Sequence, residues 1–415
     1  MQERAEWDVA VIGGGPAGLS AAHAAAAAGA RTVILERAEH PRYKTCGGGL
    51  IGASLNAVRD LSALPARDEI YSATFTLHGE HEFTRRGTRP LLKMVMREEF
   101  DAALLQRALA AGAEVRQKTM VRGITEDGMS SGGTGDRGHA TIRLGDGSSV
   151  TASVVVGADG SGGVSARHVG VTFSQVDLGL ELEIAIPEAL QREWRGRVLL
   201  DWGKIPASYG WVFPKGDRLT VGVIAARRGA SGTHGGAEGT QGSAGGTHGA
   251  RQGDATRQYL REFVERLGLA SCVAVRDSGH LTRCRTGDSP LRKGRVIVAG
   301  DAGGLLEPWT REGISFALRS GALAGEIAAK ACVADSPGKA LDEYAAAIDR
   351  GLGAEMRASG VLLNAFTRHS MTFHRGLSTA QGWRLFEKIC RSELPYPQLI
   401  RKPAARVALS VLNRL

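Results

Sequence analysis

The chain has 415 residues, of which 43% are hydrophobic and 23% charged, and it carries a formal net charge of +9. This length favours two or three domains, and the absence of a long apolar stretch, a signal-peptide pattern or a basic cluster interleaved with aromatic residues argues against a membrane-spanning, secreted or nucleic-acid-binding protein. Five cysteines, an odd number without CxxC or metal-ligand spacing, predict a reducing compartment, the cytoplasm, with neither a disulfide framework nor a metal site.

The chain opens with a strand–helix–strand unit. Asp8–Ile12 has the apolar pattern of a buried strand, and Ala17–Ala28 is dominated by the strongest helix former. Thr32–Leu35 predicts the second strand. This order is typical of a parallel α/β domain.

The loop between the first strand and the helix reads Gly-Gly-Gly-Pro-Ala-Gly, a GxGxxG spacing. Gly13 permits a tight turn, Gly15 lets the backbone approach a pyrophosphate, and Gly18 allows close packing of the helix. The amino end of the helix attracts phosphate charge, and Glu36 follows the second strand, where it can accept hydrogen bonds from a ribose hydroxyl. The motif predicts a dinucleotide cofactor without separating FAD from NAD.

The elements that follow are expected to alternate between this domain and a second one. The first domain continues with a helix over Glu98–Ala111, a strand over Glu114–Ile124 and a hairpin with a strand over Ala140–Val156. The second domain is sheet-rich, with mainly antiparallel strands expected at Glu69–His78, Glu82–Arg85, Leu91–Val95, Leu178–Ile186, Arg197–Trp202, Gly210–Pro214 and Leu219–Ala225. Gly229–Gly253 and Met129–Gly138 predict disordered surface insertions; metal binding by two histidines of the first is the disfavoured alternative.

A second strand-and-turn motif, Arg295–Ala302 (RVIVAGDA), leads towards a helix of small residues over Ile314–Val333. Asp301 could bond the ribityl chain of a flavin. The amino end of the helix, at Gly313 and Ile314, could face the flavin edge where negative charge accumulates on reduction. NAD has no ribityl chain, so the pair of motifs favours FAD.

Two further features remain open to two interpretations. Val154–Gly160 (VVVGADG) is a strand-ending turn or a third cofactor contact. Arg97 opens a helix, where a positive charge opposes the helix dipole, which favours a specific phosphate or flavin contact.

Together these motifs resemble the glutathione-reductase-type FAD fold, in the version used by p-hydroxybenzoate-hydroxylase-like enzymes. Further segments are similar to motifs of the geranylgeranyl reductase family, namely Pro41-x-Tyr43-x-x-Cys46-Gly47-Gly48-Gly49, Tyr209-x-Trp211-x-Phe213-Pro214-Lys215 and Pro308–Ile314 (PWTREGI). The resemblance runs from about Asp8 to Val333 and implies an FAD-dependent reductase that saturates C=C bonds of a polyprenyl lipid or prenyl diphosphate. The sequence departs from the family pattern at Glu307, Trp309 and Arg311, near the expected flavin position.

The resemblance also implies a site. It places the Cys46 loop beside the isoalloxazine and makes Cys46, Tyr209 and Trp211 the candidate catalytic residues, with Phe213 in the same prenyl pocket. Cys46 is expected to act as acid or redox relay, or else to pack under the flavin, and core packing is the alternative for the aromatic residues. The expected cofactor-binding residues are Gly13, Gly15, Ala17, Gly18, Glu36, Arg37, Cys46, Gly47, Gly49, Arg97, Val121, Asp301, Gly313 and Ile314.

A single dinucleotide-binding unit is evident in the sequence, which bears on the electron donor. NADPH is therefore expected to bind transiently, or an acidic protein such as a reduced ferredoxin delivers electrons to the basic surface. An FAD-dependent monooxygenase or halogenase on the same scaffold is the main alternative function, and a non-catalytic basic adaptor is a third.

The expected domains are interleaved along the chain. The FAD-binding domain comprises residues 1–66, 97–172 and 281–335, and the substrate domain comprises 67–96 and 173–280. Residues 336–415 are expected to be a helical region. In it, Leu399–Leu415 has apolar residues at helical spacing, with arginine and lysine beside them, so it could rest on an anionic membrane; packing on the protein body is the alternative.

Overall fold

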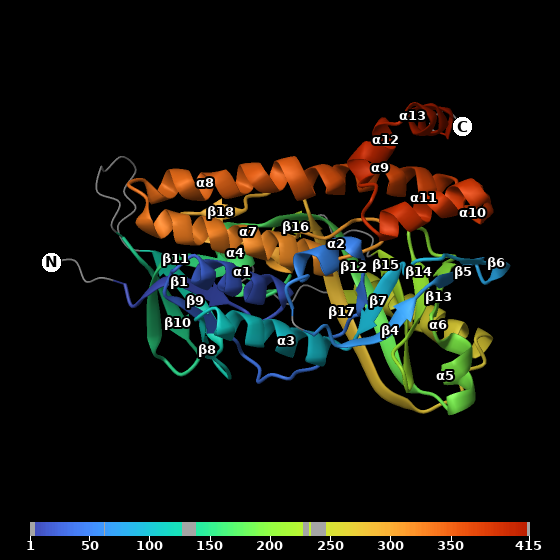
Figure 1. Cartoon of the computed structure of the whole chain (residues 1–415), viewed down its shortest axis with the longest axis horizontal. Helices are drawn as coiled ribbons and strands as arrows, with labels where there is room; N and C mark the ends of the chain where they lie inside the picture. Colours follow the sequence, from blue (N-terminus) through green and yellow to red (C-terminus); the bar gives the residue numbers. More distant parts are fainter. Residues whose placement is uncertain (1–4, 62, 127–137, 227–231, 234–245, 413–415) are drawn as a thin grey trace.

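The computed structural model describes residues 5–61, 63–126, 138–226, 232–233 and 246–412 (Figure 1). A domain built on a parallel sheet forms one half of the elongated molecule, and a mainly antiparallel sheet forms the other. The carboxy-terminal helices extend over both halves along one side. The expected architecture, a parallel-sheet domain interrupted by an antiparallel one and followed by helices, is confirmed.

The parallel sheet has the strand order β19, β11, β1, β2, β8. These strands are β1 (Trp7–Ile12), β2 (Thr32–Leu35), β8 (Glu114–Arg116), β11 (Ser149–Gly157) and β19 (Val296–Val298). Val9, Val11 and Val154 have no exposed surface, as expected for strands buried on both faces. At the edges lie β18 (Arg292–Lys293) and the hairpin strands β9 (Val121–Glu126) and β10 (Ala140–Leu144).

The prediction of one strand over Glu114–Ile124 is wrong. The segment forms two strands, because Lys118 lies between them in the left-handed region, with φ of 55°. The chain therefore turns, so that β8 extends the parallel sheet beside β2 while β9 pairs with β10.

Helices α1 (Pro16–Ala27) and α7 (Ile314–Val333) pack backbone against backbone. A Cβ atom added at Gly321 would lie 2.1 Å from the carbonyl oxygen of Ala17, and one at Gly325 would lie 2.1 Å from that of Ala21. Only glycine fits such an approach. The two helices that begin at the two predicted cofactor turns are thus fixed to each other, and α3 (Arg97–Ala110) lies on the other side of α1.

The second sheet has the order β16, β12, β15, β14, β13, β5, β6, with β17 also paired to β12. Its strands are β5 (Ser72–Leu77), β6 (Glu80–Arg86), β12 (Thr172–Ala185), β13 (Arg197–Trp202), β14 (Tyr209–Pro214), β15 (Arg218–Ala226), β16 (Gly232–Thr233) and β17 (Ala274–Arg285). Helix α6 (Gly246–Arg266) packs on it through Leu260 and Phe263, and α5 (Glu188–Trp194) lies nearby. A small sheet of β3 (Gly49–Leu50), β7 (Leu92–Val95) and β4 (Ala66–Ile70) lies between the two halves.

Four described elements of the second domain are absent from the sequence prediction, among them α5 and β16. The other two are α6 and β17, and β17 contains the expected domain boundary at 280–281. The expectation that Gly229–Gly253 lacks structure is wrong for 232–233 and 246–253, which belong to β16 and α6; its other residues, like nearly all of the insertion Met129–Gly138, lie outside the described residues.

The carboxy-terminal region is helical from α8 (Pro337–Ile348), next to the expected start at residue 336. A π-helical segment (Asp349–Gly353) joins it to α9 (Ala354–Arg368), followed by α10 (Ser370–Ser378), α11 (Ala380–Cys390), α12 (Tyr396–Arg401) and α13 (Pro403–Leu412). Among the described helices, none combines the length and the apolar composition that crossing a bilayer requires.

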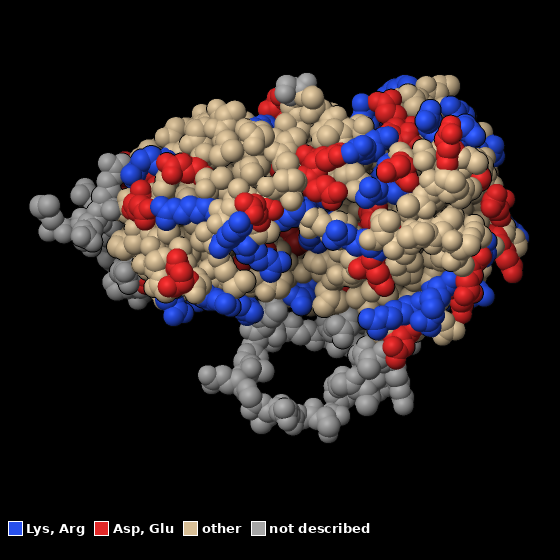
Figure 2. All heavy atoms as spheres, turned by 90° about the horizontal axis from the view of Figure 1, so that it is seen from below, with Lys and Arg blue, Asp and Glu red and all other residues tan. Residues whose placement is uncertain are grey.

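The positive net charge is not gathered on the face seen in Figure 2. There, lysine and arginine side chains are interspersed with aspartate and glutamate. A mixed surface of this kind has a weaker long-range field than a single basic patch.

Candidate active site

One continuous cavity of about 2270 Å³ runs through the centre of the molecule. It begins at the Gly13–Ala17 loop, passes Cys46 and Asp301, and ends among the carboxy-terminal helices. Typical small-molecule sites measure roughly 300–1,000 Å³, so this cavity has room for more than one ligand.

The glycine loop at the start of the cavity has the geometry that a pyrophosphate needs. Gly13 adopts φ of 103°, and an added Cβ would lie 2.4 Å from the carbonyl oxygen of Ala158. An added Cβ at Gly18 would lie 1.9 Å from the carbonyl oxygen of Gly13. At Gly15 the nearest atom to such a Cβ is 3.6 Å away, so the loop backbone is open to the cavity just where α1 begins without a side-chain cap. These features fit a dinucleotide.

The two predicted cofactor turns are neighbours. An added Cβ at Gly300 would lie 2.8 Å from the Cβ of Ala17, and Asp301, Gly313 and Ile314 line the same cavity as the first loop. One cofactor can therefore touch both turns. Of the other expected cofactor residues, Arg37, Gly49 and Val121 also line this cavity.

Two arginines beside the glycine loop share one buried carboxylate. Arg97 donates from Nε and Nη2 to the two carboxylate oxygens of Asp101, each at 2.8 Å. Arg42 Nη1 lies 3.4 Å from Asp101 Oδ2. Arg42 also donates to the carbonyl oxygen of Gly14 at 3.1 Å and lies 4.0 Å from Glu36. Burial lowers the pKa of Arg97, but Asp101 and Cys46 outweigh it and raise the pKa, so the guanidinium stays charged. Arg42 and Arg97 both line the cavity, and a guanidinium in this place suits a pyrophosphate.

Arg42 was not among the expected site residues, although it occupies the unspecified position between Pro41 and Tyr43 in the family motif. Glu36 was expected there. It accepts hydrogen bonds from the backbone N–H groups of Gly14 and Ala38, so its carboxylate is held at the mouth of the loop.

Asp301 lies in the short 3-10 turn η1 (Gly300–Gly303) at the end of β19. Burial favours its neutral form, but the imidazole of His280 and the positive charges of Lys44 and Arg97 lower the pKa of Asp301 below its ordinary value. The His280 Nε2 atom lies 3.7 Å from Asp301 Oδ2. An ionised Asp301 can accept hydrogen bonds from a hydroxylated chain such as ribityl.

The amino end of α7 carries a carboxylate of its own. Glu312 accepts hydrogen bonds from the backbone N–H of Ser315, at 2.7 Å, and from the Ser315 hydroxyl. Burial raises the pKa of Glu312 to about 7, with the negative charge of Glu307 adding to the rise. Near pH 7 the charge at this helix end therefore depends on whether Glu312 is protonated. The sequence did not indicate this.

The Cys46 loop is held by a buried glutamate from β12. The backbone N–H of Cys46 and the hydroxyl of Tyr43 each donate to Glu181 Oε1, at 2.8 Å. Burial raises the pKa of Glu181, which favours its protonated form. Lys215 Nζ lies 3.4 Å from the Cys46 carbonyl oxygen and 3.3 Å from Glu183. Neither glutamate was identified from the sequence.

The aromatic residues of β14, which the resemblance assigns to a prenyl pocket, line the cavity. Tyr209, Trp211 and Phe213 alternate along the strand, line one cavity wall, and have neighbouring ring centroids 5.8 and 6.3 Å apart. An added Cβ at Gly47 would lie 2.7 Å from the Phe213 ring, so this wall adjoins the Cys46 loop. The Tyr209 hydroxyl donates to the carbonyl oxygen of Thr310, and burial raises its pKa.

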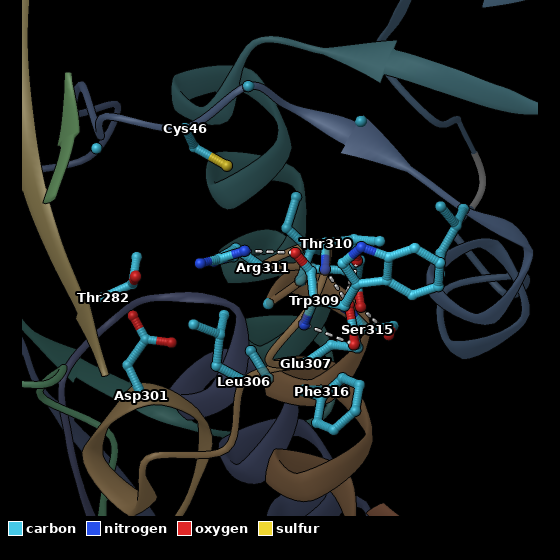
Figure 3. Close-up of a pocket in the computed structure, with 18 of the residues that line it drawn as sticks. Cys46, Thr282, Asp301, Leu306, Glu307, Trp309, Thr310, Arg311, Ser315 and Phe316 are labelled. Carbon is cyan, nitrogen blue, oxygen red and sulfur yellow. Dashed lines mark hydrogen bonds between the residues drawn. The ribbon is translucent and has the colours of Figure 1, made fainter. Parts of the chain in front are cut away.

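The residues that depart from the family pattern, Glu307, Trp309 and Arg311, lie close together in the cavity lining (Figure 3). Arg311 pairs with the buried Asp177 at 3.1 Å and donates to the carbonyl oxygens of Trp309 and Ala207. Glu307 accepts hydrogen bonds from Thr310 and from the backbone N–H of Trp309. Arg311 and Trp309 point in opposite directions in Figure 3. The side chains of Arg311 and Glu307 are therefore held by hydrogen bonds to the loop backbone, whereas the indole nitrogen of Trp309 is buried without a hydrogen-bond partner.

Beyond Trp309 the cavity becomes an apolar chamber between the second sheet and helices α9 to α13. Its lining includes Leu362, Phe366, Phe373, Leu385, Phe386, Ile389, Leu394 and Leu399. The ring of Trp309 lies 5.5 Å from that of Phe366 and 5.9 Å from that of Phe373. The sequence predicted helices here but not their part in the cavity.

The turn in Val154–Gly160 has a structural role. Asp159 accepts hydrogen bonds from the backbone N–H groups of Val164, at 2.6 Å, and Ser165, at 3.1 Å, at the start of α4 (Val164–Val169). The interpretation as a strand-ending turn is confirmed, and Gly160 also borders the cavity.

Comparisons with known proteins agree with this geometry. A family model described as FAD binding domain matches residues 6–350. The digeranylgeranylglycerophospholipid reductase of Methanocella arvoryzae is 30% identical over 421 residues, covering 97% of each chain. The chloroplastic geranylgeranyl diphosphate reductase of Oryza sativa subsp. japonica is 28% identical and covers 77% of this chain and 65% of its own.

Two solved structures share the fold. A geranylgeranyl bacteriochlorophyll reductase-like protein from Thermoplasma acidophilum aligns with a TM-score of 0.71 at 21% identity, over 98% of this chain and 99% of its own. A flavin-dependent brominase aligns with a TM-score of 0.70 at 17% identity, over 98% and 99%. At these identities, the two likenesses establish a shared architecture and leave the reaction to be argued from the site.

Proposed function

Because the chain belongs to the geranylgeranyl reductase family of FAD-dependent oxidoreductases, we propose that it saturates C=C bonds of a polyprenyl chain carried by a lipid or a diphosphate. The observation that carries the proposal is the continuity of the cavity. The space beside the cofactor turns and Cys46 opens into an apolar chamber of leucine, isoleucine and phenylalanine side chains, which suits a long hydrocarbon.

The cofactor would be held along the first half of the cavity. The Gly13–Ala17 loop and Arg42 would bind the pyrophosphate, Glu36 the ribose, and Asp301 the ribityl chain. When bound and reduced, FAD supplies the hydride for the reaction.

The protein must then supply a proton and exclude water. An isolated alkene has no carbonyl to stabilise developing charge, so a proton must reach one carbon as hydride reaches the other. Cys46 is the candidate donor, with its thiol at the junction of the cofactor space and the aromatic wall of β14. Glu181 is a positioning residue, because it holds the Cys46 backbone and the Tyr43 hydroxyl together. Tyr209 and Trp211 would align the chain by contact.

The electron donor is a separate proposal. Since basic and acidic side chains are interspersed on the face in Figure 2, we infer that NADPH is the first donor to test, with reduced ferredoxin as the alternative. Rapid mixing of the anaerobic flavoprotein with NADPH should bleach the flavin absorbance. If millimolar NADPH leaves the flavin oxidised while reduced ferredoxin bleaches it, the electron donor is ferredoxin and not NADPH.

The reaction is tested with dithionite-reduced protein, without oxygen, on geranylgeranyl lipids and geranylgeranyl diphosphate. The products should gain one pair of hydrogens for each bond saturated, as measured by mass spectrometry. Product that forms only in air, with incorporated oxygen or halide, would instead support the monooxygenase or halogenase alternative.

A matched pair of cysteine variants tests the proposed proton donor. Cys46→Ala should retain flavin but lose turnover by roughly 10²–10⁴-fold, the usual contribution of a general acid. Cys272→Ala, which changes a half-buried thiol outside the cavity lining, should retain full turnover. Equal turnover in the two variants would remove Cys46 from the mechanism.

A further inference from the structure

Helix α13 has an unusual surface for a helix in water. Its ten residues, PAARVALSVL, include no buried residue, and Val407 and Val411 are 64% and 51% exposed. A helix on the surface of a globular protein ordinarily directs its apolar residues towards the core and its polar residues outwards. In α13, apolar side chains lie on both sides.

The inward side of α13 closes the end of the apolar chamber. Ala405, Leu409 and Leu412 line the cavity there, and Ala405 and Leu409 pack on the cluster formed by Leu362, Leu394 and Leu399. The Leu412 carbonyl oxygen lies 2.7 Å from a ring nitrogen of His369, at the end of α9. Val407 and Val411 do not line the cavity, so their exposure is on the outer side.

The flanking charges are all positive. From Tyr396 to Leu412 the sequence contains Arg401, Lys402 and Arg406 and no aspartate or glutamate. All three side chains are exposed, and within the described residues none of them forms an ion pair. Figure 1 shows α12 and α13 projecting from the body at the carboxy-terminal end, where a flat surface could reach them.

We propose that α13 docks on an anionic lipid bilayer. Val407 and Val411 would enter the boundary between headgroups and acyl chains, and Arg401, Lys402 and Arg406 would lie among the anionic headgroups. The chamber end under α13 would then face the bilayer, so an apolar chain could enter without crossing water. The docking does not depend on the reaction proposed above.

The test is co-sedimentation of the full-length flavoprotein with vesicles of phosphatidylcholine alone or with phosphatidylglycerol added. The protein should bind the anionic vesicles, less at high salt, and bind the neutral vesicles weakly. Val407→Asp/Val411→Asp should weaken binding to anionic vesicles by roughly tenfold or more, because two apolar contacts are lost and two negative charges are added. Val333→Asp is the matched control: it lies 85% exposed at the end of α7 and should bind as the parent does.

Three further measurements keep the outcome decisive. Melting temperature and flavin absorbance should be the same in all variants, since none of the changed side chains is buried. Equal vesicle binding by the parent, the double variant and the Val333 control would overturn the proposal. A concentration-dependent dimer that the double variant abolishes would assign the valine face to a second copy of the chain and overturn it as well. Vesicle binding requires no turnover, so failure of the proposed reaction would leave this result unaffected.

Discussion

Arg311 and Asp177 form an ion pair in the cavity wall, with Arg311 Nε 3.1 Å from Asp177 Oδ2 and side-chain exposures of 3% and 0%. The pair joins the loop before α7 to β12. Removing one partner leaves the other charge buried without compensation. We therefore expect Arg311→Ala to lower the free energy of unfolding by about 3–5 kcal/mol in urea titrations.

The matched control for this prediction is Arg218→Ala. Arg218 pairs with Asp217 at 3.3 Å, but the side chains are 34% and 69% exposed, so the loss should not exceed about 1 kcal/mol. Similar losses of unfolding free energy in the two variants would mean that the buried Arg311–Asp177 pair stabilises the fold no more than an exposed pair does.

A second prediction concerns the contact of α1 with α7. Gly321→Ala places a methyl group within 2.1 Å of the Ala17 carbonyl oxygen, so the two helices must separate at the cofactor loop. We expect a lower melting temperature and a lower flavin content after purification. The free energy of unfolding should fall by about 1–3 kcal/mol. Gly360→Ala in α9, where an added Cβ meets nothing within 4 Å, should be neutral or slightly stabilising. An unchanged flavin content in Gly321→Ala would contradict the close approach.

A third prediction follows from Glu312, whose pKa burial raises from an ordinary 4.5 to about 7. Between these pH values the folded protein holds a proton that the unfolded chain releases. This contribution to stability is fully present below pH 4.5 and is lost as pH rises through 7.

The measurement is a series of urea unfolding curves across this pH window. Glu312→Gln cannot ionise, so the free energy of unfolding of the variant should fall less with rising pH than that of the parent. The difference between the two curves should approach about 3 kcal/mol over the window. Parallel curves would show that Glu312 does not carry the buried proton.

A fourth prediction concerns Trp309, and this prediction rests on the proposed function. Its ring lies against Phe366 and Phe373 where the cofactor space opens into the apolar chamber. Trp309→Leu should widen this passage and change the ratio of kcat/KM for farnesyl and geranylgeranyl substrates by roughly tenfold, the order of effect of added space in an apolar pocket.

The backbone hydrogen bond from residue 309 to Glu307 survives this substitution, so the loop should keep its shape. Phe83→Leu, an aromatic change outside the cavity lining, serves as control and should leave the ratio unchanged. The same ratio in both variants would exclude Trp309 as a determinant of chain selection.

The sequence predicted those elements whose pattern is local. The βαβ unit, α7 and most strands of the second sheet have apolar periodicities or glycine positions that fix their type. By contrast, β17 pairs with β12 alone among the described strands and has a single buried residue, Cys284, so it needs no apolar alternation. The turn at Lys118 has a left-handed residue without glycine or asparagine, so no composition signal marks it.

The site was predictable where a motif joins a strand end to a helix. Gly13 and Asp301 meet in one cavity because β1 and β19 are parallel strands that end at one edge of their sheet. Glu181 and the apolar chamber could not be found in this way. Tyr43 and Glu181 are 138 residues apart, and only the packing of the two domains brings them together.

The order of strands in the parallel sheet has a consequence for biosynthesis. β1 lies beside β11, and β11 lies beside β19, which the ribosome produces only in the last third of the chain, just before α7. The amino-terminal half of the sheet must therefore wait, with one edge unpaired, until translation is well advanced. Nascent chains shorter than about Val333 should be unable to retain flavin, and during that interval the exposed edge is a place where chaperones would be expected to act.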